Sequence, residues 1–222
     1  MNIAREGCLL LSAKKQETSA VCHDLLEDAN LWRQLSELDR QIAAQVQSQG
    51  CPCGGVLHRA CYPRKPRGAA RKLLTEQYES RLSFCCNKEG CRRRTTPPSV
   101  RYLGRRVYLG VIVTLACAIT HGLTFQRRDY LIERLRVDRR TFKRWLTWWH
   151  EQFPQSALWR TLRAQLPSPI VAQDLPGALL GVIHAKNLTV RLIRFLALVM
   201  PLTTCSCPHY PTLTVQPQKM PM

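Results

Sequence analysis

The chain has 222 residues, which is enough for one or two small domains. It carries 33 basic and 15 acidic side chains, and this formal net charge of +18 favours nucleic acid over an anionic membrane surface as partner. Because 45% of the residues are apolar and only 22% are charged, the composition excludes a disordered basic tail.

The positive charge is concentrated in the middle of the chain. Residues 59–106 hold fourteen basic and three acidic side chains, and residues 127–144 hold eight and three. Residues 1–50 are slightly acidic, with five basic and seven acidic side chains. We therefore expect the polyanion to contact the two central segments.

Helical and irregular stretches alternate along the chain. Apolar residues at helical spacing predict a helix over residues 20–48, and the following "QSQG" ends it. Residues 51–98 lack this periodicity and are interrupted by Cys, Gly and Pro, which predicts short strands and turns. Further predicted helices are a buried one over 105–122, two with a tight break over 127–153, one over 155–165 and one over about 175–199.

These elements define a fold class that is mainly α, with a small β zinc-ribbon-like module and a helix-turn-helix bundle. The predicted divisions are an N-terminal helical segment (1–49), the zinc-ribbon-like basic module (50–100), the helix-turn-helix bundle (101–166), a C-terminal helix (167–204) and a disordered tail (205–222).

Two groups of cysteines predict a metal site. "CPCGG" contains Cys51 and Cys53, and "FCCNKEGC" contains Cys85, Cys86 and Cys91. So short a segment has little apolar mass, and a tetrahedral thiolate site would supply the missing folding free energy. We assign Cys51, Cys53, Cys86 and Cys91 as ligands of one zinc ion per chain. Cys85 is an alternative to Cys86, and His58 and Cys61 are reserve ligands. The remaining cysteines are read as free thiols, with Cys117 in the core.

Basic segments flank the predicted metal site. "HRACYPRKPRGAARK" alternates cations with prolines, and "CRRRTT" follows the last ligand. Prolines stiffen such a loop and reduce the entropy lost when it docks on phosphates. The residues expected on DNA from these segments are Arg64, Lys65, Arg67, Arg92, Arg93 and Arg94.

The stretch "RRDYLIERLRVDRRTFKRWLTWW" has the proportions of a helix-turn-helix. Asp138 is a good N-cap for the second helix, in which Phe142, Trp145, Leu146 and Trp149 form one apolar stripe. The opposite side of this helix would enter the major groove, and the basic residues expected there are Arg139, Arg140, Lys143 and Arg144. The alternative is a solvated basic face on a plain helical hairpin.

A zinc ribbon followed by a helix-turn-helix resembles the DNA-binding part of bacterial insertion-sequence proteins, such as InsA-type accessory proteins and the N-terminal regions of some transposases. The stretches "CGGVLHRACYPRKPRG", "RLSFCCNKEGCRRRTTPPSVRYLGRRVYLG" and "RRTFKRWLTWW" are similar to small bacterial proteins associated with mobile elements. The resemblance covers about residues 50–160. It departs in the first cysteine pair, which is one residue shorter than Cys-x-x-Cys.

The resemblance and the charge together predict a sequence-specific, non-catalytic DNA-binding protein, an accessory or regulator of transposition. After residue 144 only Glu151 and Asp174 are acidic, too few for a three-carboxylate transposase site. No His-x-His motif is present, and His121 and His150 lack nuclease spacing. Alternatives are a diverged or truncated nuclease or recombinase, and an RNA-binding module.

The expected partners are double-stranded DNA, a transposase and a second copy of the chain, with no membrane. Arg191 and Arg194 interrupt the apolar stretch "LTVRLIRFLALVM", which is shorter than the ~20 residues of a membrane span. No signal-peptide pattern is recognised, so a cytoplasmic, nucleoid-associated protein is expected. In such a protein, eleven cysteines favour thiols or metal over disulfides.

Overall fold

The structure is a computed structural model that describes residues 25–64, 79–103, 108–119, 129, 132–133, 135, 137–166 and 169–204. Its α-helices are α2 (Ala29–Gln49), α3 (Gly110–Ile119), α5 (Arg139–Thr147), α6 (Ala157–Arg163), α7 (Gly177–Val182) and α8 (Leu188–Val199). Its strands are β1 (Leu57–Arg59), β2 (Tyr62–Pro63), β3 (Ser80–Arg81), β4 (Phe84–Cys86), β5 (Arg94–Thr95), β6 (Tyr102–Leu103) and β7 (Tyr108–Leu109). Short π and 3-10 turns cover Trp148–Gln152, Phe153–Gln155, Ala172–Asp174 and Met200–Thr203.

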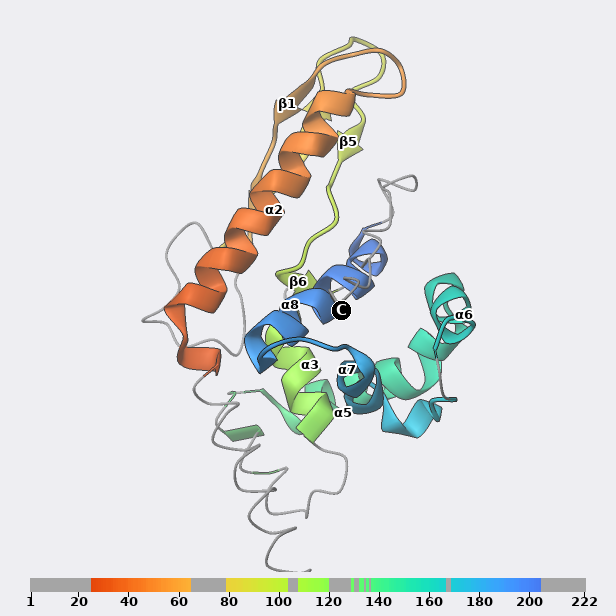
Figure 1. Ribbon diagram of the computed structural model, residues 1–222. Coiled ribbons are helices and arrows are strands. Elements are labelled where there is room, and N and C mark those ends of the chain that lie inside the picture. The colour runs from red at the N-terminus through yellow and green to blue at the C-terminus, as the bar shows by residue number, and fades with distance from the viewer. Residues whose placement is uncertain are drawn as a thin grey trace, which may run out of the picture.

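The protein is mostly helical, with a small antiparallel sheet, as the sequence predicts. β1, β4 and β5 form the sheet in the order β1-β4-β5, and β2–β3 and β6–β7 form two further short ladders. In Figure 1 the sheet lies beside the upper end of α2, and the remaining helices gather at the lower end. No helix in the described ranges is long and apolar enough to cross a membrane.

Helix α2 connects two separate apolar cores. Leu31, Trp32 and Leu35 from its first half are fully buried in the larger core, which α3, α5, α7 and α8 complete. Ala43 and Val46 from its second half pack in a small core under the sheet, with Leu57, Phe84, Cys51 and Cys86. The helix begins after Asp28, whose carboxylate accepts from Asn30 N, and ends at Gly50 with φ of 70°.

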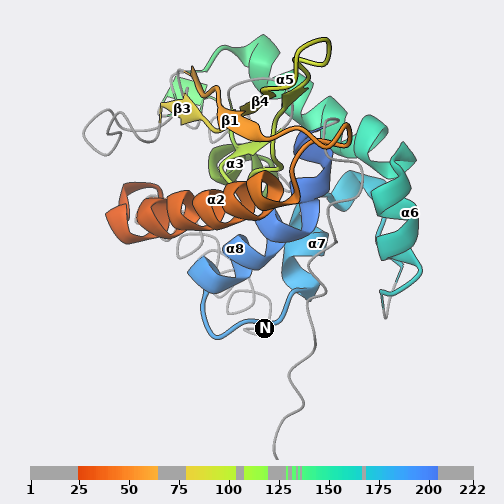
Figure 2. The same ribbon diagram turned by 90° about the horizontal axis from the view of Figure 1, so that it is seen from above.

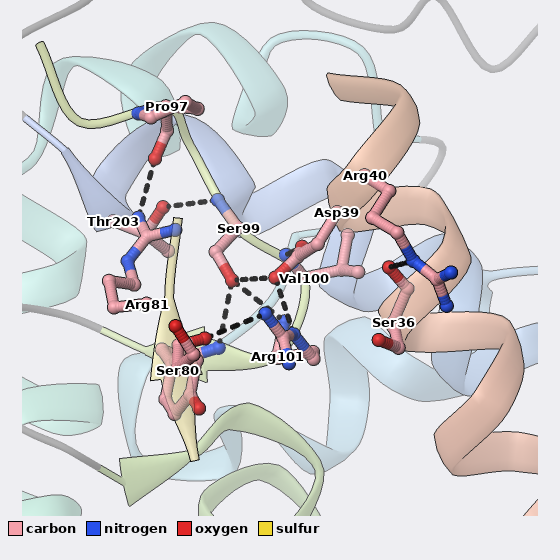
Figure 3. Close-up of polar contacts among 11 residues, drawn as sticks. Ser36, Asp39, Arg40, Ser80, Arg81, Pro97, Ser99, Val100, Arg101 and Thr203 are labelled. Carbon is pink, nitrogen blue, oxygen red and sulfur yellow. Dashed lines mark hydrogen bonds and ion pairs between the residues drawn. The ribbon is translucent and has the colours of Figure 1, made fainter. Parts of the chain in front are cut away.

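Asp39, between the two halves of α2, is buried and carries a charge into the interior (Figure 3). One carboxylate oxygen accepts from Arg101 Nε at 2.7 Å and from Ser99 Oγ at 2.6 Å, and the other accepts from Val100 N at 2.7 Å. Arg101 also donates to Ser80 O at 3.1 Å. The pair therefore joins α2 to the segment that leaves the sheet and to β3.

A second arginine, Arg81, lies in the same buried region with a single described hydrogen bond, to Pro97 O. Its Nη1 has no hydrogen-bond partner, and burial lowers the pKa of the guanidinium, partly offset by Asp39. The charge of Asp39 favours both guanidinium groups, and Arg101 is the one that forms an ion pair with it.

Three helix boundaries differ from the sequence prediction. Tyr108–Leu109 form a strand paired with Tyr102–Leu103, and α3 begins only at Gly110. The predicted helix over 175–199 is two helices, because the chain breaks after α7 and restarts at Asn187, whose side chain accepts from Val190 N. In each case the apolar run was long enough for one helix. Strand pairing shortens the first helix, and the Asn187 cap divides the second.

The remaining helix predictions are confirmed in outline. α2 and α6 lie within the predicted ranges but for one residue at the end of α2, and residues 129, 132–133 and 135 are helical ahead of α5. Cys117 is buried in α3, as predicted, and burial raises the pKa of its thiol. The tail from residue 205 and His121 lie outside the described residues.

We predict that Asp39→Asn destabilises the protein by about 3–5 kcal/mol, because it leaves Arg101 buried without its counter-charge. Denaturant unfolding of both proteins measures the difference. The matched control is Glu37→Gln on the same helix, whose pair with Arg40 is about half exposed and should change stability by less than about 1 kcal/mol. Equal effects of the two substitutions would contradict the assignment of Asp39 as the buried counter-charge.

Candidate metal centre and basic surfaces

The four cysteines predicted as ligands come together at one point. The Sγ atoms of Cys51, Cys53, Cys86 and Cys91 all lie within 4.8 Å of one another. The Cys51–Cys91 pair is 3.8 Å apart and the Cys53–Cys86 pair 3.5 Å. A tetrahedral metal with sulfur bonds of about 2.3 Å would place its ligands roughly 3.8 Å apart, so the cluster fits a four-coordinate soft-metal site.

The backbone around the cluster turns its amides toward the sulfurs. Lys88 N donates to Cys86 Sγ at 3.4 Å, and the Gly55 amide donates to Cys53. Gly54 and Gly90 take φ values of +81° and +80°, the left-handed conformation that closes each knuckle. A Cβ at Gly55 would lie only 2.5 Å from Cys86 Sγ, so the sulfur occupies the space that any side chain would need.

The thiols differ in acidity because their hydrogen bonds differ. The Gly55 amide and the neighbouring thiols lower the pKa of Cys53 to about 6. At Cys86 the Lys88 amide lowers the pKa, but burial and the neighbouring thiols outweigh it and raise the pKa to about 12. One thiolate is thus favoured among four close sulfurs, and a divalent cation at their centre would favour all four.

Cys85 points away from the cluster. It alternates with Cys86 along β4, so Cys86 is buried beneath the sheet while Cys85 is partly exposed on the outer face, opposite His58. Cys61 is exposed, and its nearest described partner is Ser83 O at 3.9 Å. None of these three residues belongs to the group of four. The pleat of the strand therefore selects Cys86 over its neighbour.

Three arginines leave the cluster directly after its last cysteine. Arg93 O accepts from Cys86 N at 3.0 Å, and Arg92 N donates to Lys88 O at 3.3 Å. Arg92 takes φ of 43°, a left-handed conformation unusual outside glycine. Arg92, Arg93 and Arg94 are all exposed, and Arg94 also donates from Nη1 to Ala60 O at 3.3 Å.

The outer face of the sheet continues this positive surface. Arg94 pairs with Cys85 across β4–β5, and its guanidinium lies 5.5 Å from the centre of the Tyr62 ring. Arg64 approaches the same ring at 4.8 Å. Arg59 at the end of β1 is exposed too, but it lies opposite Phe84 and therefore not on this outer face. Glu79 and Glu89 are the exposed acidic residues of the described part of the module. Lys65 and Arg67 lie outside the described residues.

Helix α5 presents the second positive surface. Its stripe is buried as predicted, with Phe142, Trp145 and Trp149 no more than 6% exposed and Leu146 partly buried. Asp138 caps the helix by accepting from Thr141 N at 2.7 Å and from Thr141 Oγ1 at 2.8 Å, which lowers the pKa of Asp138. The sequence-predicted cap and core face are therefore confirmed.

The four basic residues predicted on α5 are all exposed but not equally available. Arg139 forms an exposed ion pair with Asp129 at 2.9 Å, and Arg144 donates to Thr141 Oγ1 at 2.7 Å. Arg140 and Lys143 make no hydrogen bond or ion pair with any described residue. These two are the side chains of α5 best placed to meet an external anion.

Sequence reasoning missed the buried charges. It counted Arg81 and Arg101 with the basic surface, whereas both are at least 95% buried, and Arg101 forms an ion pair with Asp39. One signal was present, because Asp39 stands on the same helical stripe as Leu35 and Ile42. His150, read from sequence as structural, has its Nε2 3.1 Å from Leu175 O.

Comparison of the chain with family models, with curated proteins and with solved structures finds no match. Its function must therefore be argued from its own residues.

We predict that Cys86→Ser loses bound metal while Cys85→Ser keeps it, because only the first side chain points into the cluster. Metal analysis of the two purified proteins, prepared without chelator, measures this directly. The substitutions are adjacent and chemically identical, so a general effect of losing a thiol is controlled. Loss of metal from both, or from neither, would contradict the site.

We predict that Gly55→Ala weakens metal affinity by about 10–100-fold, because its methyl group must displace Cys86 Sγ. Competition with a chromophoric chelator measures the affinity. Gly181→Ala in α7 is the control, since nothing lies within 4 Å of an added Cβ there, and it should leave the metal affinity unchanged. An unchanged metal affinity in Gly55→Ala would contradict the prediction, because the added methyl group would then not disturb Cys86 Sγ.

Proposed function

We propose that this protein is a zinc-stabilised, non-catalytic protein that binds double-stranded DNA in a sequence-specific manner. The observation that carries the proposal is the exposed run Arg92–Arg94, whose backbone is hydrogen-bonded to the thiolate centre. Zinc is the favoured ion because four cysteine thiolates in a closed tetrahedral arrangement suit a structural zinc site. The resemblance to insertion-sequence proteins supports a role as accessory or regulator of transposition.

The two surfaces take different parts in this proposal. Phosphate contacts position a protein on DNA, and contacts to base edges specify the sequence. The arginines beside the metal centre contact phosphates, because they fan out from one short, fixed turn. Helix α5 reads bases in the major groove, because aromatic residues hold it from behind while Arg140 and Lys143 extend from the exposed side.

Metal analysis tests the first part of the proposal. We expect about one zinc ion per chain, since the cluster offers four thiolates. Removal of the ion with a strong chelator should unfold the small core under the sheet, because Cys51 and Cys86 are part of it. Zinc content near zero after purification without chelator would refute the zinc assignment.

Salt dependence tests the second part. If several arginines and lysines neutralise phosphates, the slope of log affinity against log salt is roughly −0.9 for each phosphate on duplex DNA. Fluorescence anisotropy over a range of salt concentrations measures this slope. A slope near zero on duplex DNA, or tighter binding to structured RNA of equal length, would refute duplex DNA as the partner. Cleavage of the probe in Mg²⁺ or Mn²⁺ would refute the non-catalytic assignment.

Substitutions test the division between reading and positioning. With a site selected from random duplexes, Arg140→Ala should lose ~1–3 kcal/mol of discrimination between that site and random DNA, if the contact is bidentate to guanine. Arg93→Ala should weaken binding to both DNAs about equally and make the salt slope shallower. Arg160→Ala, an exposed arginine on α6, is the control and should change neither quantity. Altered sequence preference in Arg93→Ala, but not in Arg140→Ala, would reverse the two roles.

A further inference from the structure

The two basic surfaces are separate parts of the molecule. The ribbon surface, on the small sheet module at the end of α2, consists of Arg92, Arg93 and Arg94, and the α5 surface consists of Arg140, Lys143 and Arg144. In Figure 1 the small sheet lies at the upper end of α2, and α5 lies in the lower part of the molecule beside α3. Figure 2 shows the ribbon strands and α5 on one side of α2, and α8 on the other.

Helix α2 fixes the separation of these surfaces. Residues from Leu31 to Ile42 anchor it in the core that contains Phe142 and Trp145 of α5, and Ala43 and Val46 anchor it in the small core under the sheet. The centres of these two anchors are about 8 residues apart, or about 12 Å along the helix axis at roughly 1.5 Å per residue. The basic side chains project outward from each core.

The joint between the two cores is stiffened at its middle. Asp39 bonds to Val100 N, Ser99 Oγ and Arg101 Nε, which lie on the segment that runs from the sheet toward α3. Ser99 N in turn donates to Thr203 Oγ1 at the end of α8. The chain thus crosses from one core to the other twice, and the two crossings are bonded to each other in a buried position.

From this arrangement, and resting on the DNA-binding function proposed above, we infer that one duplex contacts both surfaces at two places along its axis. A rigid spacing means that the second contact follows the first with little further entropy cost, so the two contacts reinforce each other. A separation of about 12 Å or more corresponds to about three or more base pairs at roughly 3.4 Å each, in addition to the length that each surface covers. A short duplex cannot reach both.

A length series of DNA hairpins of one random sequence tests this inference. Stems of about 6 to about 20 base pairs, at ~3.4 Å for each base pair, include lengths too short and lengths long enough to reach both surfaces. Affinity and salt slope are measured for the wild-type protein and for two variants. One variant is Arg92→Ala/Arg93→Ala/Arg94→Ala, and the other is Arg140→Ala/Lys143→Ala. Zinc content and unfolding midpoint confirm that each variant is folded.

A longer stem offers more positions at which the protein can bind, and this alone raises the apparent affinity. For the wild type we expect a larger rise than this, together with a steeper salt slope on long stems. Each variant should keep the slope of its remaining surface at every length, so the steepening disappears. A wild-type slope independent of length, or a variant that still steepens, would overturn the inference. A binding stoichiometry of two long stems per protein chain would overturn it too, because the two surfaces would then bind separate duplexes. If the wild type binds no stem, the proposed function itself fails.

Discussion

The ion pair between Asp39 and Arg101 is the interaction on which the rest of the structure depends. Asp39 sits where α2 passes from the large core to the small one, and its carboxylate accepts three hydrogen bonds from residues 99–101. Burial makes this pair costly to break, since either partner alone would leave a charge without solvent or counter-charge. The pair therefore fixes how the sheet module is attached to the helical core.

The metal centre is built on the same helix. Gly50 ends α2, and Cys51 follows at once, so the first proposed ligand stands at a helix terminus that two cores hold in place. The small core contains few apolar side chains, among them Leu57 and Phe84, and two of the cysteines belong to it. So small an apolar core stabilises the module little, and a metal ion held by the four thiols would add to its stability. Helix α2 contributes residues to both cores and so connects the sheet module to the larger core.

The distribution of cations follows from these two constraints. Arg81 and Arg101 are buried and serve the fold, and Arg101 is neutralised by Asp39. Arginines that follow Cys91, and the cations on the exposed side of α5, face solvent and give the protein its external positive field. A count of charges along the sequence does not separate these groups, so the net charge of +18 overstates what a polyanion can meet.

The sequence by itself determined the local features of this protein. Helical spacing predicted α2 and the buried stripe of α5, Asp138 was identified as a cap, and the knuckles named Cys51, Cys53, Cys86 and Cys91. These are properties of neighbouring residues. Tertiary structure alone decided that β4 turns Cys86 inward and Cys85 outward, that Tyr108–Leu109 pair as a strand, and that Asp39 meets Arg101 across 62 positions. Each of these depends on which other segment lies opposite, and periodicity along one segment does not contain that information.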